Sequence, residues 1–127
     1  MKITLIQSDI IWEDKDQNFA RFERLISGIT EETGMIFLPE MFNTGFSMNP
    51  EILCEDPCSV TMEWLLLMAK KFNVGIGGSY IVKEHNTYYN RWLFTEPGGR
   101  MWKYDKRHLF SPGNENILFS KGRERVV

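Results

Sequence analysis

The chain has 127 residues, of which 43% are hydrophobic and 25% charged, with a formal net charge of −2. These values are typical of one soluble globular domain, and they give no electrostatic basis for binding nucleic acid or an anionic membrane. No apolar run approaches the roughly 20 residues of a membrane-spanning helix. The N-terminus lacks the features of a secretion signal, so we expect a cytoplasmic protein.

The first third of the chain predicts alternating strands and a helix. Residues 3–9 are β-branched or apolar with polar interruptions, which favours a strand. Asp14 or Asp16 can cap the helix that follows. Residues 35–38 form a wholly apolar run, typical of a strand buried on both faces. The apolar residues that recur at helical spacing are Phe19, Phe22, Ile26 and Ile29.

Residues 59–72 predict a second helix. Its stretch 64–69 is apolar nearly all round, so we expect it to be heavily buried. The turn at 96–99 contains Pro-Gly-Gly, which predicts a hairpin between the strands on either side. The resulting order, β-α-β-α-β-β-β, favours an α/β domain with helices on a sheet. Strands are predicted at 74–80, 88–95, 100–104 and, as a beginning only, 125–127.

Glu40 is the first candidate for chemistry. It follows a buried strand and precedes a loop, and functional sites in open α/β sheets gather at the carboxyl ends of strands. The apolar neighbours Leu38, Met41 and Phe42 predict a desolvated carboxylate suited to general-base catalysis. The alternative is a glutamate that merely caps or solvates the strand end, which on spacing alone is the commoner case.

The segment 104–110, with the sequence Tyr-Asp-Lys-Arg-His-Leu-Phe, is the second candidate. It also follows a predicted strand, and it is both basic and aromatic. Lys106 is suited to donate to an oxyanion that forms during acyl transfer. The alternative is a solvated basic turn, and nucleic-acid binding is disfavoured because the rest of the chain supplies no basic face.

The glycine-rich stretch 75–79 invites comparison with a phosphate-binding loop. It lacks both the GxGxxG spacing and the Gly-Lys-Ser/Thr ending of such loops. Its glycines lie inside a predicted strand, where they more often allow close approach of other groups to the backbone. We therefore expect a structural role for this stretch.

The two cysteines, Cys54 and Cys58, do not amount to a disulfide framework. A zinc site would need two further ligands, and only His85 and His108 are available, without zinc-finger spacing. We therefore expect free thiols and no metal.

Several of these segments resemble motifs of one family when they are taken together. Residues 38–42, followed by Thr-Gly-Phe at 44–46, look like a glutamate motif, and residues 104–110 look like a lysine motif. Both resemble the nitrilase (carbon–nitrogen hydrolase) superfamily, and the pair is specific in combination. Asn-Arg at 90–91 and Glu-Pro-Gly-Gly at 96–99 extend the likeness along nearly the whole chain. The bacterial omega-amidase branch, which acts on 2-oxoglutaramate-type ω-amides, is the most similar.

The resemblance implies an α-β-β-α sandwich, of which residues 1–127 form roughly the N-terminal half of a single domain. It also implies a Glu-Lys-Cys triad in which Glu40 is the general base and Lys106 stabilises the oxyanion. Glu115 falls where the family has a second, supporting glutamate. The implied reaction is hydrolysis of a small-molecule amide through a cysteine thioester, without metal or cofactor. A homodimer or higher oligomer of the full-length protein is also implied.

The chain departs from the family in one respect. The family's cysteine lies after a further strand beyond the lysine motif, and Cys54 and Cys58 precede that motif, so neither matches. We favour a piece of a longer enzyme over a natural short protein that lost catalysis. A half-sandwich would expose an apolar sheet face and unpaired edges. In both cases we expect no amidase activity from this chain alone.

Two other interpretations remain open. The chain is either a non-catalytic α/β interaction module, in which Glu40 and Lys106 have no reason to meet, or another superfamily amidase, nitrilase or carbamoylase. The enzyme interpretation instead requires the two side chains to converge on one pocket.

Overall fold

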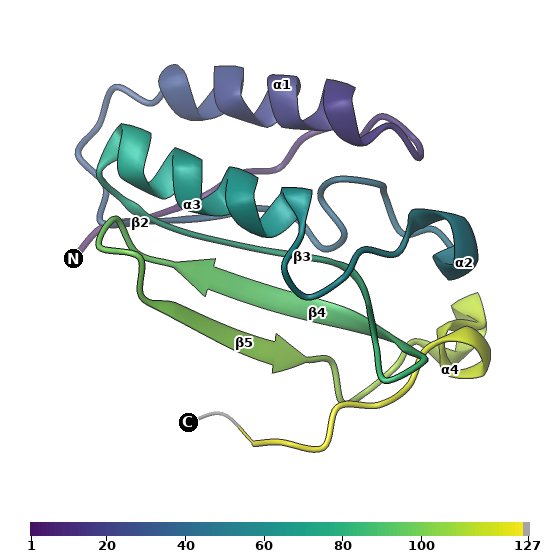
Figure 1. Cartoon of the computed structure of the whole chain (residues 1–127). Helices are drawn as coiled ribbons and strands as arrows, with labels where there is room; N and C mark the ends of the chain where they lie inside the picture. The colour runs from purple at the N-terminus through teal and green to yellow at the C-terminus, as the bar shows by residue number, and fades with distance from the viewer. Residues whose placement is uncertain (126–127) are drawn as a thin grey trace.

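The computed structural model describes residues 1–125 and contains one mixed five-stranded sheet in the order β1-β2-β3-β4-β5 (Figure 1). The first three strands are parallel, and β4 and β5 extend the sheet by antiparallel pairing. The strand expected to begin at 125–127 lies outside the described residues except for Arg125. The strands are β1 (Ile3–Leu5), β2 (Met35–Phe37), β3 (Gly75–Glu84), β4 (Thr87–Thr95) and β5 (Met101–Asp105).

Two long helices lie side by side on one face of the sheet (Figure 1). The first, α1 (Lys15–Ser27), is capped by Asp14, whose side chain accepts a hydrogen bond from the backbone N–H of Gln17 at 3.0 Å. The second, α3 (Val60–Phe72), is capped by Ser59. The expected order of strands and helices is confirmed. Short helical turns were not expected: α2 (Pro50–Leu53), η1 (Ser111–Gly113) and α4 (Glu115–Leu118).

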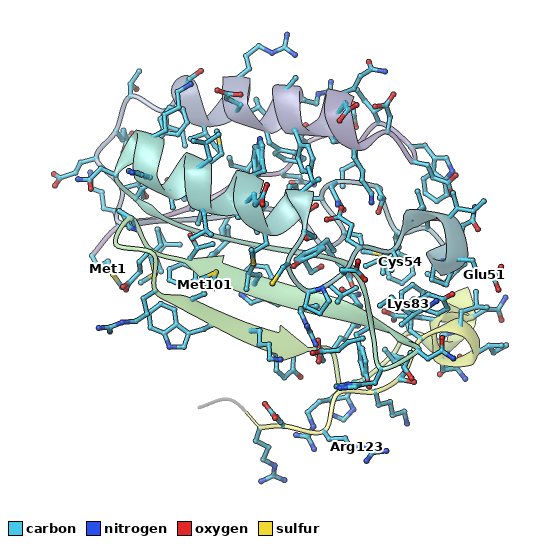
Figure 2. The ribbon with its side chains drawn as sticks, viewed as in Figure 1. Met1, Glu51, Cys54, Lys83, Met101 and Arg123 are labelled. Carbon is cyan, nitrogen blue, oxygen red and sulfur yellow. The ribbon has the colours of Figure 1, made fainter. Side chains whose placement is uncertain are left out.

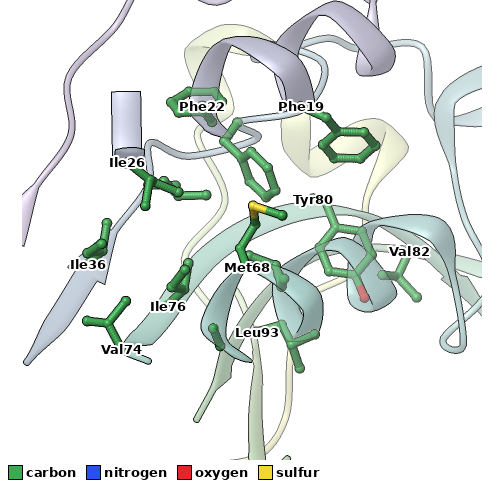
Figure 3. Packing of buried hydrophobic residues seen from close by; sticks show 14 residues of the cluster. Phe19, Phe22, Ile26, Ile36, Met68, Val74, Ile76, Tyr80, Val82 and Leu93 are labelled. Carbon is green, nitrogen blue, oxygen red and sulfur yellow. The ribbon is translucent and has the colours of Figure 1, made fainter. Parts of the chain in front are cut away.

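The main core lies between these two helices and the sheet. Phe22 of α1 and Met68 of α3 face each other above Ile76 and Tyr80 of β3, and all four side chains are buried (Figure 3). Stretch 64–69 of α3, expected to be heavily buried, has Leu65, Met68 and Ala69 buried, but Leu67 is 58% exposed. A helix that covers a sheet turns only one side towards it.

The third strand continues beyond the expected end at Tyr80 to Glu84. It then reverses into β4 through His85 and Asn86, whose φ angles of 50° and 61° lie in the left-handed region. Two consecutive left-handed residues are what a tight hairpin turn with the right-handed strand twist requires. A second hairpin, between β4 and β5, was expected from the Pro-Gly-Gly turn and is confirmed, with Thr95 opposite Met101.

The first strand is shorter than the expected 3–9. It ends at Leu5, and one further bond joins the N–H of Ile6 to the carbonyl of Phe37 at 2.9 Å. The neighbouring strand β2 ends at Phe37, so later residues have no strand to pair with. The chain instead turns, and the N–H of Ile11 binds the side chain of Asn18 at 2.8 Å.

On the sheet face opposite the two long helices, aromatic side chains pack against one another and form an aromatic face made of Phe37, Trp92, Phe94, Trp102 and Tyr104. Gly77 of β3 allows the ring of Trp92 to lie against the backbone, because a Cβ atom there would stand 2.6 Å from that ring. The structural role expected for the glycines is therefore confirmed. The apolar face is open at its edges, where Leu5 is 76% and Trp102 40% exposed. Over residues 1–125, none of the helices combines the length and apolar composition that crossing a bilayer requires.

Candidate active site

Glu40 lies three residues after β2, in a segment that β3 holds in place. The backbone N–H of Met41 donates to Ser79 Oγ at 2.9 Å, and that of Phe42 donates to the Ser79 carbonyl at 3.2 Å. Met41 adopts a left-handed φ of 48°, which turns the chain sharply directly after Glu40.

The expected desolvation of the Glu40 carboxylate is not observed. Its neighbours Leu38, Met41 and Phe42 are buried in the two hydrophobic clusters of the molecule. The Glu40 side chain is instead 46% exposed. The apolar residues therefore anchor the turn, and the carboxylate projects from it.

Lys106 is the first residue after β5, and backbone bonds fix it on two sides. Its N–H donates to the carbonyl of Asn90 at 2.9 Å, and its own carbonyl accepts from the N–H of Gly122 at 3.0 Å. Its ammonium lies 5.3 Å from the centre of the Phe46 ring, a cation–π contact that covers one side of the lysine.

Glu115 begins the short helix α4, which Figure 1 shows beyond the end of β5. The residue is fully buried. One of its oxygens, Oε2, accepts the backbone N–H of Phe110 at 2.6 Å and the ammonium of Lys106 at 2.9 Å.

The structure thus brings the three sequence-predicted residues into one cluster. Lys106 Nζ lies 2.7 Å from Glu40 Oε1 and 2.9 Å from Glu115 Oε2. Asn90 joins them, since its Nδ2 donates to Glu40 Oε1 at 2.7 Å and to Glu115 Oε1 at 3.0 Å. Sequence reasoning assigned Asn90 no role. The available signal was an asparagine in mid-strand, where this residue type is depleted.

The hydrogen bonds of the cluster favour the charged forms of Lys106 and Glu115. Burial alone would lower the pKa of Lys106, but bonds to Glu40 and Glu115 outweigh it and raise that pKa. Burial alone would raise the pKa of Glu115, but bonds from Asn90, from the Phe110 N–H and from Lys106 together lower it. The lysine is therefore an ammonium and the buried glutamate a carboxylate at neutral pH.

A cavity of about 250 Å³ opens beside this cluster, and its walls are largely apolar. Its volume suits a small organic molecule. The residues that line it are Glu40, Ser79, Asn90, Trp92, Tyr104 and Lys106.

The remaining candidates of the sequence lie elsewhere. Cys54 and Cys58 are free thiols, and neither lines the cavity. Figure 2 shows Cys54 beside α2. Within residues 1–125 there is no group of three or more His, Cys, Asp or Glu side chains arranged to hold a metal ion.

Two known proteins that match this chain in sequence are both named as amidases. Omega-amidase YafV from Escherichia coli K12 is 37% identical over 129 residues, which cover all of this chain and 49% of that protein. The 2-oxoglutaramate amidase of Bacillus subtilis strain 168 is 30% identical over 125 residues, covering 96% of this chain and 48% of that protein. The chain thus spans about half the length of the curated relatives it matches.

Solved structures of other proteins share the fold of this chain. XC1258 from Xanthomonas campestris, a CN-hydrolase superfamily protein, is 34% identical with a TM-score of 0.90 over 98% of this chain and 47% of its own. Nit3 of Saccharomyces cerevisiae, a nitrilase-superfamily member, is 24% identical and shares the fold, with a TM-score of 0.83 over 98% of this chain and 49% of its own. The family model described as carbon-nitrogen hydrolase matches residues 2–127. The chain therefore belongs to the carbon–nitrogen hydrolase family.

Proposed function

We propose that residues 1–127 are the N-terminal portion of a single carbon–nitrogen hydrolase domain and supply its general base and its oxyanion-stabilising cation. The observation that carries this proposal is the 2.7 Å contact between Glu40 and Lys106 at a small apolar cavity, made by residues 66 positions apart. An interaction module has no need to bring these two groups together.

The hydrogen bonds suggest which atoms act. Glu40 Oε1 accepts from both Lys106 and Asn90, whereas Oε2 has no hydrogen-bond partner among residues 1–125. Oε2 is therefore the oxygen free to take a proton. An ammonium has three N–H donors, and Lys106 uses two of them on Glu40 and Glu115, which leaves one for a substrate oxygen.

Acyl transfer at this site uses a cysteine thiol as nucleophile. Glu40 takes the thiol proton while sulfur attacks the amide carbon, and Lys106 stabilises the resulting oxyanion. Collapse breaks the carbon–nitrogen bond, and nitrogen receives the proton from Glu40 and leaves as ammonia. Glu40 then deprotonates water, which attacks the thioester and breaks the carbon–sulfur bond; Glu40 returns the proton to sulfur, and a carboxylic acid and the thiol are released.

We propose that the thiol comes from the half of the domain that the longer relatives possess and this chain does not span. Neither Cys54 nor Cys58 lines the cavity. We therefore expect no turnover from residues 1–127 alone. We propose for the full-length enzyme a cytoplasmic location and a homodimer or higher oligomer.

The proposed substrate is the ω-amide of a small 2-oxo acid. Two observations support it: the names of the relatives, which are an omega-amidase and a 2-oxoglutaramate amidase, and a cavity of about 250 Å³. Nitriles, N-carbamoyl amides and other amides are the substrates to compare with it.

A chimera tests the function. The chain is fused to the C-terminal half of Escherichia coli omega-amidase YafV, and ammonia release from 2-oxoglutaramate is measured. We expect turnover from the chimera and none from the chain alone. Glu40→Gln and Lys106→Met should each abolish turnover, whereas Glu63→Gln and Lys70→Met, at exposed positions of α3, should not.

Two results would contradict the proposal. One is a Glu40→Gln chimera that is as active as its parent. The other is a folded chimera that releases no product from amides, nitriles or carbamoyl compounds, which would favour a non-catalytic interaction module.

A further inference from the structure

We propose that Asn90 is a positioning residue of this site: its side-chain amide joins the carboxylates of Glu40 and Glu115, while its backbone carbonyl fixes Lys106. A catalytic consequence of this role rests on the proposed function. The hydrogen bonds of Asn90 do not depend on the proposed function, so the positioning role and its catalytic consequence can be tested separately.

The backbone around Asn90 is held on both sides. It lies in β4, opposite Ile81 of β3, and its carbonyl accepts the N–H of Lys106 at 2.9 Å on the β5 side. Only 2% of the residue is exposed. A side chain in a paired inner strand has little freedom, so its amide is a fixed reference point for groups that come from loops.

Both N–H donors of the Asn90 side-chain amide are engaged in hydrogen bonds. One N–H reaches Glu40 Oε1 at 2.7 Å and the other reaches Glu115 Oε1 at 3.0 Å. Both partners are carboxylates, which accept hydrogen bonds and do not donate them when ionised. The orientation of the amide is therefore determined by the chemistry of its partners.

A neutral donor suits the charges of this cluster. One ammonium, on Lys106, contacts two carboxylates, and like charges that share a site resist ionisation. Asn90 contributes the largest of the hydrogen-bond effects that lower the pKa of Glu115. Asn90 stabilises the carboxylates without adding a second positive charge. Glu40, the proposed proton acceptor, therefore has Lys106 as its one cationic partner among residues 1–125.

Asn90 also links three separate parts of the chain. Glu40 follows β2, Lys106 follows β5 and Glu115 begins α4, and Asn90 is bonded to all three. Without it, Lys106 would be the only bridge between the two glutamates that the structure shows within residues 1–125. A long flexible side chain defines that geometry less well than a short buried amide.

The first test measures the pKa of Glu115 and does not require an active enzyme. In the 127-residue chain, carbon-13 NMR of the glutamate carboxyl groups follows Glu115 in Asn90→Leu, which keeps the approximate shape and removes both donors. We expect the pKa of Glu115 to rise clearly above its value in the parent. If Asn90→Leu does not fold, Asn90→Ser, which retains one donor, should give a smaller rise.

A matched control removes one side-chain hydrogen bond from the carboxylate of Glu55, whose side chain is 9% exposed. Thr61 Oγ1 donates to Glu55 Oε1 at 2.7 Å, so Thr61→Val should raise the pKa of Glu55 and leave Glu115 unchanged. A Glu115 pKa that stays at its parental value in both folded Asn90 variants would overturn the positioning role.

The second test uses the chimera. Asn90→Leu should lower kcat by at least about tenfold, since hydrogen bonds to charged groups are worth this much or more, and should change KM less. An active chimera whose kcat is unaffected by Asn90→Leu refutes the catalytic consequence while the proposed function stands. An inactive parent chimera combined with a raised Glu115 pKa in Asn90→Leu supports the positioning role and contradicts the proposed function.

Discussion

Asn90 and Arg91 are neighbours on β4, and their side chains leave the sheet on opposite faces, where each contacts two carboxylates. Arg91 donates to Asp105 at 2.7 Å and also to Glu84, and the hydrogen bonds that it makes to these carboxylates raise its pKa. Asn90 binds the two glutamates of the candidate site. Arg91 therefore forms ion pairs with its two carboxylates. Asn90 carries no charge, so it holds its two carboxylates without forming ion pairs with them.

The Arg91 cluster should contribute to stability. Arg91→Met leaves Glu84 and Asp105 without their main partner while Arg91 itself is only 3% exposed. We expect a loss of about 2–3 kcal/mol in the free energy of unfolding, somewhat below that of a fully buried pair because the carboxylates retain contact with water. Urea denaturation measures it. Lys103→Met, which removes a lysine 4.0 Å from Glu84, should have almost no effect.

The turn that carries Glu40 should depend on Ser79. Ser79→Ala removes the acceptor of the Met41 N–H, a buried donor in a left-handed residue. We expect a loss of about 1–2 kcal/mol, together with faster amide hydrogen exchange at Met41. Ser8→Ala, whose hydroxyl makes only an exposed local bond, is the control. Unchanged exchange at Met41 would contradict the anchoring role.

A methyl group at position 77 should destabilise the chain, because the Trp92 ring lies against the backbone of Gly77. Gly77→Ala would place Cβ 2.6 Å from the Trp92 ring, so we expect a loss of about 1–3 kcal/mol and a shifted indole NMR signal. Gly98 has open space around its Cβ position, so Gly98→Ala should be close to neutral. Equal stability of the two variants would argue against the close approach.

Acid should destabilise the chain partly through Glu115. The folded pKa of Glu115 is lowered from its ordinary value of 4.5, so its contribution is present above pH 4.5 and is lost as the pH falls through the folded pKa. The free energy of unfolding should therefore decrease below pH 4.5 less steeply in Glu115→Gln than in the parent. Glu55, whose pKa is also lowered, contributes equally to both, so the difference isolates Glu115. Parallel curves would refute this assignment.

The cysteines of this chain should be dispensable. Neither Cys54 nor Cys58 lines the cavity, so a chimera carrying Cys54→Ala and Cys58→Ala should retain the ammonia release of its parent. Loss of turnover with the fold intact, judged by circular dichroism, would show that one of them takes part.

Local patterns account for the parts of the fold that the sequence predicts. Helical periodicity predicted α1, a long apolar stretch predicted α3, and the Pro-Gly-Gly turn predicted the second hairpin. The rule that sites gather at strand ends drew attention to Glu40 and Lys106, and the family resemblance supplied Glu115. The structure places all three within hydrogen-bond distance of one another or of Asn90.

Other features depend on contacts that no local pattern encodes. The end of β1 follows from where β2 ends, and α2 and α4 are too short for periodicity to appear. The part played by Asn90 depends on the register of β4 between its two neighbours, because a shift by one residue would turn its side chain to the other face. The exposure of Leu67 likewise reflects which side of α3 meets the sheet.

The aromatic face of the sheet has a consequence for how an active site is completed. Trp92 and Tyr104 belong to that face and are also walls of the cavity beside Glu40 and Lys106. A polypeptide layer that docked on this face would therefore also cover the cavity. In the full-length enzyme proposed above, packing of the remaining half of the domain against this face would complete the fold and enclose the candidate site in the same step.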